Sequence, residues 1–513
     1  MSSQGKGEAA SPLDLVVIGG GINGVGVARD AAGRGMSVLL CEKDDLGQGT
    51  SSRSGKYIHG GLRYLEYYEF RLVREALIER EVLLEAGPHI MWPMRLVLPH
   101  SPEQRPAWLV RLGLFLYDHL GGRKRLPATR ALDLHEVPEG VPLKDVYKKA
   151  FEYADCWVDD ARLVVLNAVD ARDKGAEILT RTECLSARRE GKLWRVTLRN
   201  EEGERIVFAR GLVNAAGPWV EKVLGNVAGV NTKRRVRLVK GSHVIMKRWW
   251  KGDHGYVLQN TDKRLLFINP YQDDLALVGT TDIPFEGRAE DVAISDGEVA
   301  YLMAVLNRYF KKQFAAEDVL TSYSGVRPLY DDDSEKGASA VTRDYTFELD
   351  GGEGRAPILS AFGGKITTFR RLSEHALEKL KPFYPEMKPA WTAKAHLPGG
   401  DMPNADFDAW LKGFKAHHPW LPDGLARHYA RLYGTRAEAI LSDAEAVADL
   451  GRHFGGDLYE REVRFLIEEE WAETADDILV RRTKQGLFLT PEQKTALASW
   501  LERRPAPRPA VTA

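Results

Sequence analysis

The chain has 513 residues, of which 44% are hydrophobic and 28% are charged, and these values exclude a disordered, collagen-like or coiled-coil protein. The formal net charge of −1 provides no overall field that would attract nucleic acid, so no nucleic-acid partner is predicted. Three scattered cysteines exclude a disulfide framework or a zinc site, and no metal is expected. The sequence shows neither a signal-peptide core nor an apolar run of ~18 residues, which indicates an intracellular chain.

A β-α-β unit opens the chain. Residues 15–18 form an apolar run typical of a buried parallel strand, residues 25–33 indicate a helix, and residues 37–41 indicate a second strand. Gly19, Gly21 and Gly24 stand between the first strand and the helix, where they allow a tight turn and a close approach of the backbone to a pyrophosphate. Glu42 ends the second strand, where a carboxylate accepts ribose hydroxyls, so FAD or NAD is favoured over NADP.

Three later segments favour a flavin over NAD. Residues 49–56 are rich in Ser and Gly, residues 214–219 follow a strand end with small residues, and residues 362–368 form a glycine turn before a helix. Their hydroxyl and backbone N–H groups suit a phosphate or the edge of an isoalloxazine ring. Several segments that converge on one nucleotide are typical of flavin sites, whereas a single segment is typical of NAD sites.

The rest of the chain predicts a sheet-rich middle and a helical end. Residues 57–126 are expected to be mainly helical, and from residue 401 the pattern is almost wholly helical. The fold class is therefore α/β (α+β overall), with a Rossmann-type nucleotide-binding domain interleaved with a sheet-rich substrate domain over 14–399 and a helical domain over 400–502. Residues 1–13 and 503–513 are predicted to be disordered tails. Individual strands are expected over 193–198, 204–208, 211–214, 256–258 and 265–268, and helices over 70–84, 407–414, 425–433 and 457–480.

Six motifs in one order give the chain a recognisable family pattern. They are Gly-Gly-Gly-Ile-Asn-Gly (19–24), Ile-His-Gly-Gly-Leu-Arg-Tyr (58–64), Asn-Ala-Ala-Gly-Pro-Trp (214–219), Tyr-Ser-Gly-Val-Arg-Pro (323–328), Thr-Arg-Asp-Tyr (342–345) and Phe-Gly-Gly-Lys (362–365). From about residue 14 to 501 the chain resembles the aerobic, FAD-dependent glycerol-3-phosphate dehydrogenases of bacteria, which are D-amino-acid-oxidase-like flavoproteins. It departs from the pattern in its extended N-terminus and at Ser54-Gly55.

The resemblance implies an activity and a cofactor. The expected reaction is oxidation of sn-glycerol 3-phosphate to dihydroxyacetone phosphate by hydride transfer to FAD, with electrons passed to a membrane quinone in glycerol and glycerophospholipid catabolism. The residues expected to contact FAD are Gly19, Gly20, Gly21, Ile22, Asn23, Gly24, Glu42, Lys43, Thr50, Ser51, Ser52, Lys56, His59, Gly60, Gly217, Gly363, Gly364, Lys365, Ile366 and Thr367.

A glycerol 3-phosphate site must hold a phosphate dianion beside a secondary alcohol. The planar fork of arginine suits phosphate, and Arg327 is the favoured anion clamp because related amino-acid oxidases bind a carboxylate with an arginine of the equivalent turn. His59 and His243 are both candidates for the base that removes the hydroxyl proton, and the choice stays open. Lys365 is expected to stabilise the developing alkoxide. The predicted catalytic residues are His59, Arg327 and Lys365, and the predicted substrate contacts are Arg63, Tyr64, His243, Thr281, Arg327 and Arg343.

Residues 105–125 predict contact with a lipid bilayer. The segment is too short to span a membrane, yet it has a broad apolar face and basic residues near its ends, a pattern typical of a helix that lies at a lipid interface. A core helix with a basic turn is the alternative. The aromatic and basic residues 247–251 are a second, weaker candidate for the same surface. The protein is therefore expected to be cytoplasmic and peripherally bound to the cytoplasmic membrane, with a homodimer left open.

Three alternative functions differ from this one in testable ways. A soluble glycerol-3-phosphate oxidase would use oxygen and would not need the apolar face of residues 105–125. An amino-acid oxidase of the same fold would need one arginine for a carboxylate and a less cationic pocket. An FAD-binding structural module would need neither His59 beside Arg63 nor the turn that carries Arg327.

Overall fold

The computed structural model describes residues 11–101, 103–232, 234–279, 282–331 and 344–503. An 8-stranded sheet forms around the predicted β-α-β unit, with the strand order β17-β18-β10-β1-β2-β7, with β9 beside β10 and with β8 beside β9. β1 is parallel to both β10 and β2, so the carboxyl ends of these buried strands meet at one edge. The strands are β1 (Leu13–Ile18), β2 (Val38–Cys41), β7 (Glu177–Leu179), β8 (Glu183–Glu190), β9 (Leu193–Asn200), β10 (Gly203–Asn214), β17 (Thr346–Gly352) and β18 (Arg355–Phe362).

A 10-stranded sheet forms the second layer, with the strand order β15-β11-β14-β13-β12-β4-β6-β3 and with β16 beside β11 and β5 beside β6. Its longest pairing joins β11 to β16, in an antiparallel register that sets Tyr323 opposite His243. The strands are β3 (Tyr57–Ile58), β4 (Met91–His100), β5 (Arg130–Asp133), β6 (Lys149–Val158), β11 (Arg235–Lys247), β12 (Gly255–Gln259), β13 (Leu265–Tyr271), β14 (Leu275–Gly279), β15 (Ile283–Pro284) and β16 (Val319–Asp331).

Helices cover the sheets, and α1 packs between α4 and α7. No helix in the described ranges is both long and apolar enough to cross a bilayer. The helices outside the C-terminal region are α1 (Ile22–Gly33), α2 (Phe70–Ala86), α3 (Ala107–Leu120), α4 (Asp160–Asp173), α5 (Val220–Lys222), α6 (Asp296–Tyr309) and α7 (Phe369–Leu380).

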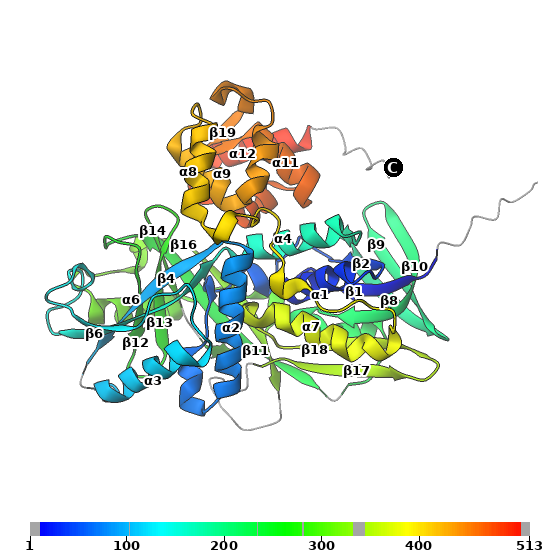
Figure 1. The fold of residues 1–513 in the computed structure, drawn as a ribbon, viewed down its shortest axis with the longest axis horizontal. Coiled ribbons are helices and arrows are strands. Elements are labelled where there is room, and N and C mark those ends of the chain that lie inside the picture. The colour runs from blue at the N-terminus through cyan, green and yellow to red at the C-terminus, as the bar shows by residue number, and fades with distance from the viewer. Residues whose placement is uncertain (1–10, 102, 233, 280–281, 332–343, 504–513) are drawn as a thin grey trace, which may run out of the picture.

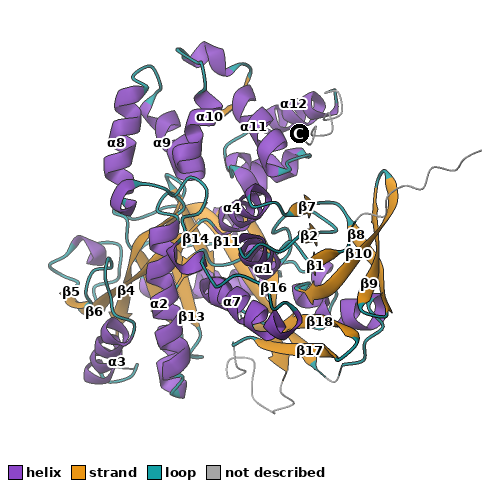
Figure 2. Cartoon of the chain, turned by 45° about the vertical axis from the view of Figure 1, so that its right-hand side comes forward, coloured by secondary structure: helices purple, strands orange, loops and turns teal. Residues whose placement is uncertain are grey.

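The C-terminal helices form a region of their own, which lies above the two sheets in Figure 1 and remains separate in the turned view of Figure 2. Its apolar core runs from Met402 to Leu501 and is a cluster distinct from those of the sheets. We call residues 402–503 the helical region. It contains α8 (Phe407–His417), α9 (Asp423–Tyr433), α10 (Ala437–Leu441), α11 (Glu460–Glu470), α12 (Pro491–Glu502) and the short strands β19 (His453–Gly455) and β20 (Leu458–Tyr459).

The predicted fold class is confirmed, but four local predictions need correction. The first helix begins at Ile22, three residues before the predicted start. Residues 91–100, placed within a mainly helical stretch, form strand β4. The strands expected at 204–208 and 211–214 are one strand, β10. The helix expected over 457–480 ends at Glu470, because Trp471 adopts a left-handed φ of 55° that an α-helix does not tolerate. The predicted disordered tails lie outside the described residues, apart from 11–13 and Arg503.

Candidate active site

A cavity of about 1230 Å³ is lined by residues of both sheets. One part of its wall is formed by the glycine turn after β1, a second by β11 and β16, and a third by η2 (Leu62–Tyr67) and α3. The space is therefore continuous from the nucleotide-binding turn to the apolar helix that the sequence analysis placed at a membrane.

The glycine turn has the shape that a dinucleotide requires. Gly24 lies so close to Gly19 that a Cβ at Gly24 would stand 1.8 Å from the Gly19 carbonyl oxygen, which explains why the helix can begin directly behind the strand. The Asn23 side chain donates to the Gly363 carbonyl over 3.2 Å and so joins this turn to the turn after β18. Its oxygen, Asn23 Oδ1, is buried without a partner among the described residues.

Glu42 closes the other side of this turn. Its carboxylate accepts from the backbone N–H of Gly20 at 2.7 Å and from that of Asp44 at 2.9 Å. Burial raises the pKa of Glu42, and these two donated bonds oppose the rise. Ser51 Oγ accepts from the Ile22 N–H at 3.0 Å, at the N-terminus of α1. The residues present fit FAD: the N-terminus of α1 suits its pyrophosphate, and Glu42 suits its ribose.

Most of the residues predicted to contact FAD line the cavity. The exceptions, which are not among its lining residues, are Gly20, Gly24, Ser52, Lys56, Gly60 and Thr367. Lys56 is buried and donates to Asp160 over 2.6 Å and to the Ser52 carbonyl over 2.7 Å. The residues in the wall are Gly19, Gly21, Ile22, Asn23, Glu42, Lys43, Thr50, Ser51, His59, Gly217, Gly363, Gly364, Lys365 and Ile366.

Arg327 supplies a cation to the cavity. Its guanidinium pairs with Asp282 at 3.0 Å, and its side chain keeps a relative exposure of 37%. It comes from β16, in register with Val239 of β11. Because a guanidinium can bind two oxygens of an oxyanion through parallel N–H groups, this position suits a phosphate.

His243 lines the same wall of the cavity as Arg327. Its ring stacks on Tyr323 with centroids 4.9 Å apart, and a Cβ at Gly279 would stand only 2.0 Å from its Cδ2 atom. Burial, Lys56 and Arg327 together lower the pKa of His243 to about 3, so the ring is neutral at neutral pH. Among the described residues, its Nδ1 atom has no hydrogen-bond partner.

Further predicted residues meet at the same place. His59, Arg63, Tyr64 and Lys365 all line the cavity. Lys365 Nζ lies 3.9 Å from the centre of the Tyr64 ring, and the backbone N–H of His59 donates to Thr367. Thr281 and Arg343 lie outside the described residues.

Sequence reasoning did not assign roles to Asp282 and Tyr323. Asp282 orients Arg327, and Tyr323 supports His243 while its hydroxyl donates to the Ser54 carbonyl over 2.7 Å. Tyr323 stands in one of the quoted motifs, and Asp282 directly follows the predicted Thr281, so position within a motif was the available signal.

Two family models match the chain. Residues 14–370 match FAD dependent oxidoreductase, and residues 390–502 match the C-terminal domain of alpha-glycerophosphate oxidase. The D-erythritol 1-phosphate dehydrogenase of Brucella abortus is 62% identical, covering 95% of this chain and 97% of that protein. The glycerol-3-phosphate dehydrogenase of Pseudomonas aeruginosa is 53% identical, covering 98% of both chains. The aerobic glycerol-3-phosphate dehydrogenase of Escherichia coli is 50% identical, covering 95% and 97%.

The fold is also similar to solved structures. The glycerol-3-phosphate dehydrogenase of Bacillus halodurans, complexed with FAD, superposes with a TM-score of 0.75 and 24% identity, covering 96% of this chain and 94% of that chain. The L-alpha-glycerophosphate oxidase of Mycoplasma pneumoniae superposes with a TM-score of 0.59 and 16% identity, covering 76% and 99%. These comparisons confirm the predicted family resemblance and the predicted cofactor. The chain belongs to the FAD dependent oxidoreductase family, and FAD is its cofactor.

Proposed function

We propose that this protein oxidises sn-glycerol 3-phosphate to dihydroxyacetone phosphate and passes the electrons to a membrane quinone. The observation that carries the proposal is the continuity of one cavity, which joins the FAD-binding turn, a wall with several cationic side chains and an apolar surface. Relatives of 53% and 50% identity that are named glycerol-3-phosphate dehydrogenases support it.

The proposed chemistry divides among the residues of the cavity. Arg327 and Arg63 hold the phosphate, and Lys365 stabilises negative charge on the substrate oxygen. His59 or His243 accepts the proton of the secondary hydroxyl while its carbon loses a hydride and a ketone forms. FAD, when bound, accepts that hydride. A phosphate dianion at Arg327 raises the pKa of His243 from its low value, which makes this histidine a better base once the substrate is bound.

D-Erythritol 1-phosphate is a second candidate substrate. The relative named D-erythritol 1-phosphate dehydrogenase has the higher identity, 62%, over nearly the full chain. The two candidates share a phosphate ester on a polyol chain, so the same arginines can hold either, and the length of the polyol decides between them.

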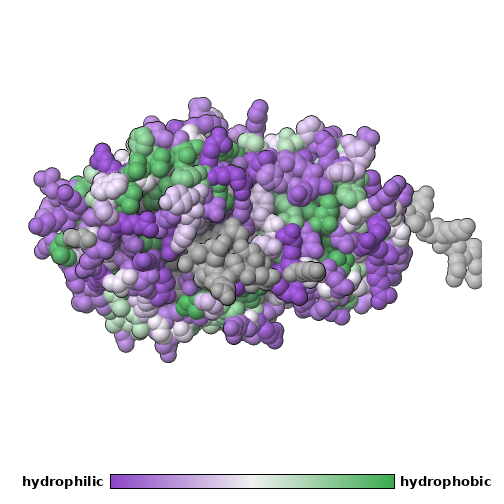
Figure 3. Space-filling model, turned by 90° about the horizontal axis from the view of Figure 1, so that it is seen from below, coloured by the Kyte–Doolittle hydropathy of each residue, from purple (hydrophilic) through white to green (hydrophobic). Residues whose placement is uncertain are grey.

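We propose that the α3 end of the cavity faces the membrane and admits the quinone. Trp108, Leu112 and Phe115 of α3 are 68%, 47% and 55% exposed, and Tyr68, which directly follows the neighbouring η2, is 81% exposed. Apolar side chains gather in a hollowed patch on the underside of the molecule, on the side where α3 lies (Figure 3). Leu109, Leu112 and Leu116 also line the cavity, so an apolar ligand can reach it from this surface.

The basic residues of this segment support membrane contact only in part. Arg111, Arg123 and Lys124 are exposed, whereas Arg105 pairs with Glu66 and Arg125 donates to carbonyls of the helical region. Trp249 and Trp250 of the second candidate surface are packed inward instead. Trp250 is 6% exposed, and Trp249 packs edge-on against Phe310 and Phe314, so they do not reach a bilayer.

The proposed organisation and location follow from these features. The chain divides near residue 400 into an FAD-dependent oxidoreductase region (14–399) and a helical domain (400–502), which the separate core of residues 402–501 supports. The proposed location is the cytoplasmic face of the membrane. Dimerisation stays a prediction that light scattering of the purified protein tests.

Anaerobic flavin bleaching tests the function. We expect sn-glycerol 3-phosphate to bleach the FAD absorbance, and a soluble quinone to restore it faster than oxygen does. Faster recovery with oxygen would indicate an oxidase. A kcat/KM for D-erythritol 1-phosphate at least tenfold higher than that for sn-glycerol 3-phosphate would reassign the substrate. Bleaching by amino acids alone would contradict the proposal.

A further inference from the structure

Residues 45–56, which we call the flavin loop, connect the Glu42 turn to β3 and form part of the cavity wall. Buried side chains hold the loop from the side away from the cavity. Asp160 accepts from the Ser54 hydroxyl at 2.7 Å and from the Lys56 ammonium at 2.6 Å. Lys56 has a left-handed φ of 64°, so the loop turns sharply at the point where Asp160 holds it.

The helical region also contacts the N-terminus of α4, where Asp160 holds the flavin loop. Lys484 is 5% exposed, and its ammonium donates to both carboxylate oxygens of Asp159, the residue next to Asp160. Asp159 caps α4 by accepting from the Arg162 N–H at 3.1 Å. Lys484 and Lys56 therefore pair with adjacent carboxylates at the N-terminus of one helix, with Lys484 from the helical region and Lys56 from the flavin loop.

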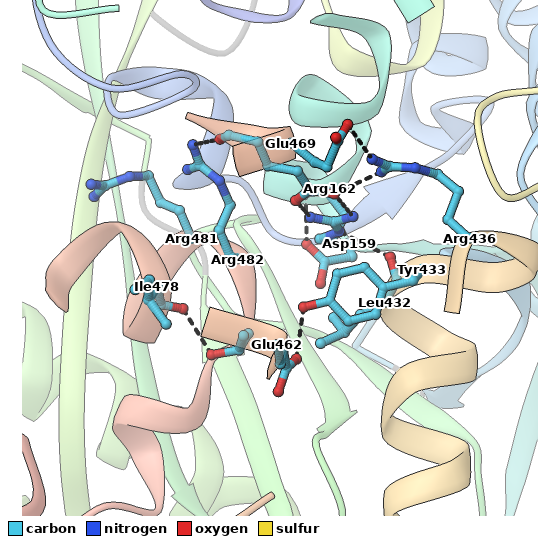
Figure 4. Close-up of polar contacts among 12 residues, drawn as sticks. Asp159, Arg162, Leu432, Tyr433, Arg436, Glu462, Glu469, Ile478, Arg481 and Arg482 are labelled. Atoms are coloured by element: carbon cyan, nitrogen blue, oxygen red, sulfur yellow. Dashed lines mark hydrogen bonds and ion pairs between the residues drawn. The ribbon is translucent and has the colours of Figure 1, made fainter. Parts of the chain in front are cut away.

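A second contact holds the beginning of the loop. Asp45 is 1% exposed and accepts from Arg482 at 2.6 and 2.8 Å and from Arg481 at 2.5 Å. Arg162 of α4 is fully buried and pairs with Glu470 of α11, next to these arginines. Figure 4 shows Arg162, Arg481 and Arg482 together at this junction. The helical region thus binds Asp45 at the start of the loop directly, and through Asp159 it contacts the helix end that holds Lys56 at the end of the loop.

The loop in turn contacts the catalytic wall. The Tyr323 hydroxyl donates to the Ser54 carbonyl at 2.7 Å, the Lys56 ammonium lies 5.2 Å from the centre of the Tyr323 ring, and that ring stacks on His243. A Cβ at Gly55 would stand 3.4 Å from His243 Nε2. A shift of the loop would therefore move both a wall of the FAD site and the ring beside the substrate.

We propose that Lys484 is a positioning residue: through Asp159 and Asp160 it fixes the flavin loop for FAD binding and, through Tyr323, fixes His243. The helical region thereby helps to hold the flavin site in its binding conformation. The inference rests on the proposed function only in that it places the flavin loop against FAD and His243 beside the substrate.

The Lys484→Met variant tests the proposal in the full-length holoenzyme. Met keeps the length of the side chain and removes the charge, so the Asp159 carboxylate becomes unpaired. We expect FAD to dissociate at least tenfold faster, measured as the rise of free-FAD fluorescence after dilution. In the FAD-saturated variant we expect kcat with sn-glycerol 3-phosphate to fall about tenfold with KM within twofold, because Arg327 is untouched.

Two further variants separate positioning from general stability. Arg172→Gln breaks a contact between the same two elements, the pair from Arg172 of α4 to Glu469 of α11, at the end of α4 away from the flavin loop. It should leave FAD release and kcat unchanged. Lys484→Arg should restore FAD retention. Ser54→Ala, which removes the hydroxyl that donates to Asp160 and accepts from the Lys56 N–H, should speed FAD release if Lys484→Met fails to fold.

Some outcomes would overturn the proposal without touching the function. Wild-type FAD release in Lys484→Met, or in Ser54→Ala where Lys484→Met does not fold, would do so, as would equal acceleration in Arg172→Gln. Failure of the wild-type flavin to be reduced by either polyol phosphate would instead contradict the proposed function, since FAD release is measured without substrate.

Discussion

Arg327 gains its orientation from a residue that is distant in the sequence but close on the sheet. Its β16 lies against β11, and Asp282, which pairs with Arg327, directly precedes β15 on the same sheet. The pairing fixes the guanidinium before a substrate arrives, so little side-chain entropy is lost when a phosphate binds.

Replacing Arg327 should separate substrate binding from cofactor binding. In Arg327→Ala we expect FAD to stay bound and substrate-driven flavin reduction to slow by roughly two orders of magnitude, since a charged contact to the phosphate is lost. Anaerobic stopped-flow absorbance measures this rate. Arg308→Ala is the matched control, because Arg308 also lines the cavity but pairs with the exposed Glu103. An unchanged rate in Arg327→Ala would remove Arg327 from the site.

Sequence motifs identified residues of the site, but they did not identify the side chains that hold those residues in place. Arg327 and Lys365 were predictable because each stands in a motif, and His243 was predictable as a candidate base; all three line one cavity. Their supports were not predictable, because the register that sets Tyr323 opposite His243 depends on pairing between strands about eighty residues apart.

At the scale of elements, α3 combines two environments in one helix. Leu114 and Tyr117 are buried at 1% and 2%, whereas Trp108 and Phe115 on the other face are more than half exposed. The helix therefore packs on the protein with one face and presents an apolar face outward, which supports both interpretations that the sequence left open for residues 105–125.

The exposed face of α3 should determine membrane binding. Replacing Trp108 and Phe115 together by Ser removes about 2 kcal/mol of apolar burial for each side chain, so binding to anionic lipid vesicles should weaken at least tenfold. Vesicle co-sedimentation measures the binding, and flavin reduction by substrate should be unchanged. Ser at Val141 and Val146, which are 70% and 73% exposed, is the control. Equal vesicle binding by both double variants would argue against α3 as the contact.

Elements with a strong local pattern were predictable and those defined by packing were not. The β-α-β unit was predicted because its apolar runs and glycines agree with each other. β4 was predicted to be helical, although Pro93 and Pro99 within it disfavour a helix. It is a strand because it lies between β6 and β12, and those neighbours are invisible to a local reading.

At the scale of the whole molecule, the helical region lies on the side opposite α3 (Figure 1). Its separate apolar core made it predictable as a unit. How it docks was not predictable, because docking depends on isolated charged residues such as Arg162, Glu470 and Asp45, which become partners only in the folded chain.

His89 makes this junction sensitive to acid. It is fully buried, and both ring nitrogens lack partners among the described residues. Burial lowers the pKa of His89 far below its usual value, Arg162, Arg431 and Arg436 lower it further, and Glu470 opposes them. Protonation therefore favours the unfolded chain. The free energy of unfolding is unaffected by His89 above about pH 6.5, where the histidine is neutral in both states, and it decreases as the pH falls below that value.

The pH dependence of unfolding should change when His89 is replaced. For His89→Gln we expect the free energy of unfolding between pH 6.5 and 5 to fall less steeply than in the wild type, by up to about 1.4 kcal/mol per pH unit, which corresponds to one proton. Denaturant titration at several pH values measures the slope. His135→Gln changes an exposed histidine and should keep the wild-type slope. Identical slopes in all three proteins would show that His89 does not take up this proton.

The order of strands in the first sheet has a consequence for biosynthesis. β1 emerges first from the ribosome, but its neighbour β10 ends at Asn214, and the turn that Asn23 contacts lies at Gly363. The ion pair between Asp45 and Arg482 forms only after Arg482 has been synthesised. A nascent chain thus carries an incomplete nucleotide cradle throughout most of translation. We therefore expect cofactor loading to follow the synthesis of Arg482, since a chain released before that residue would lack contacts that hold the flavin loop.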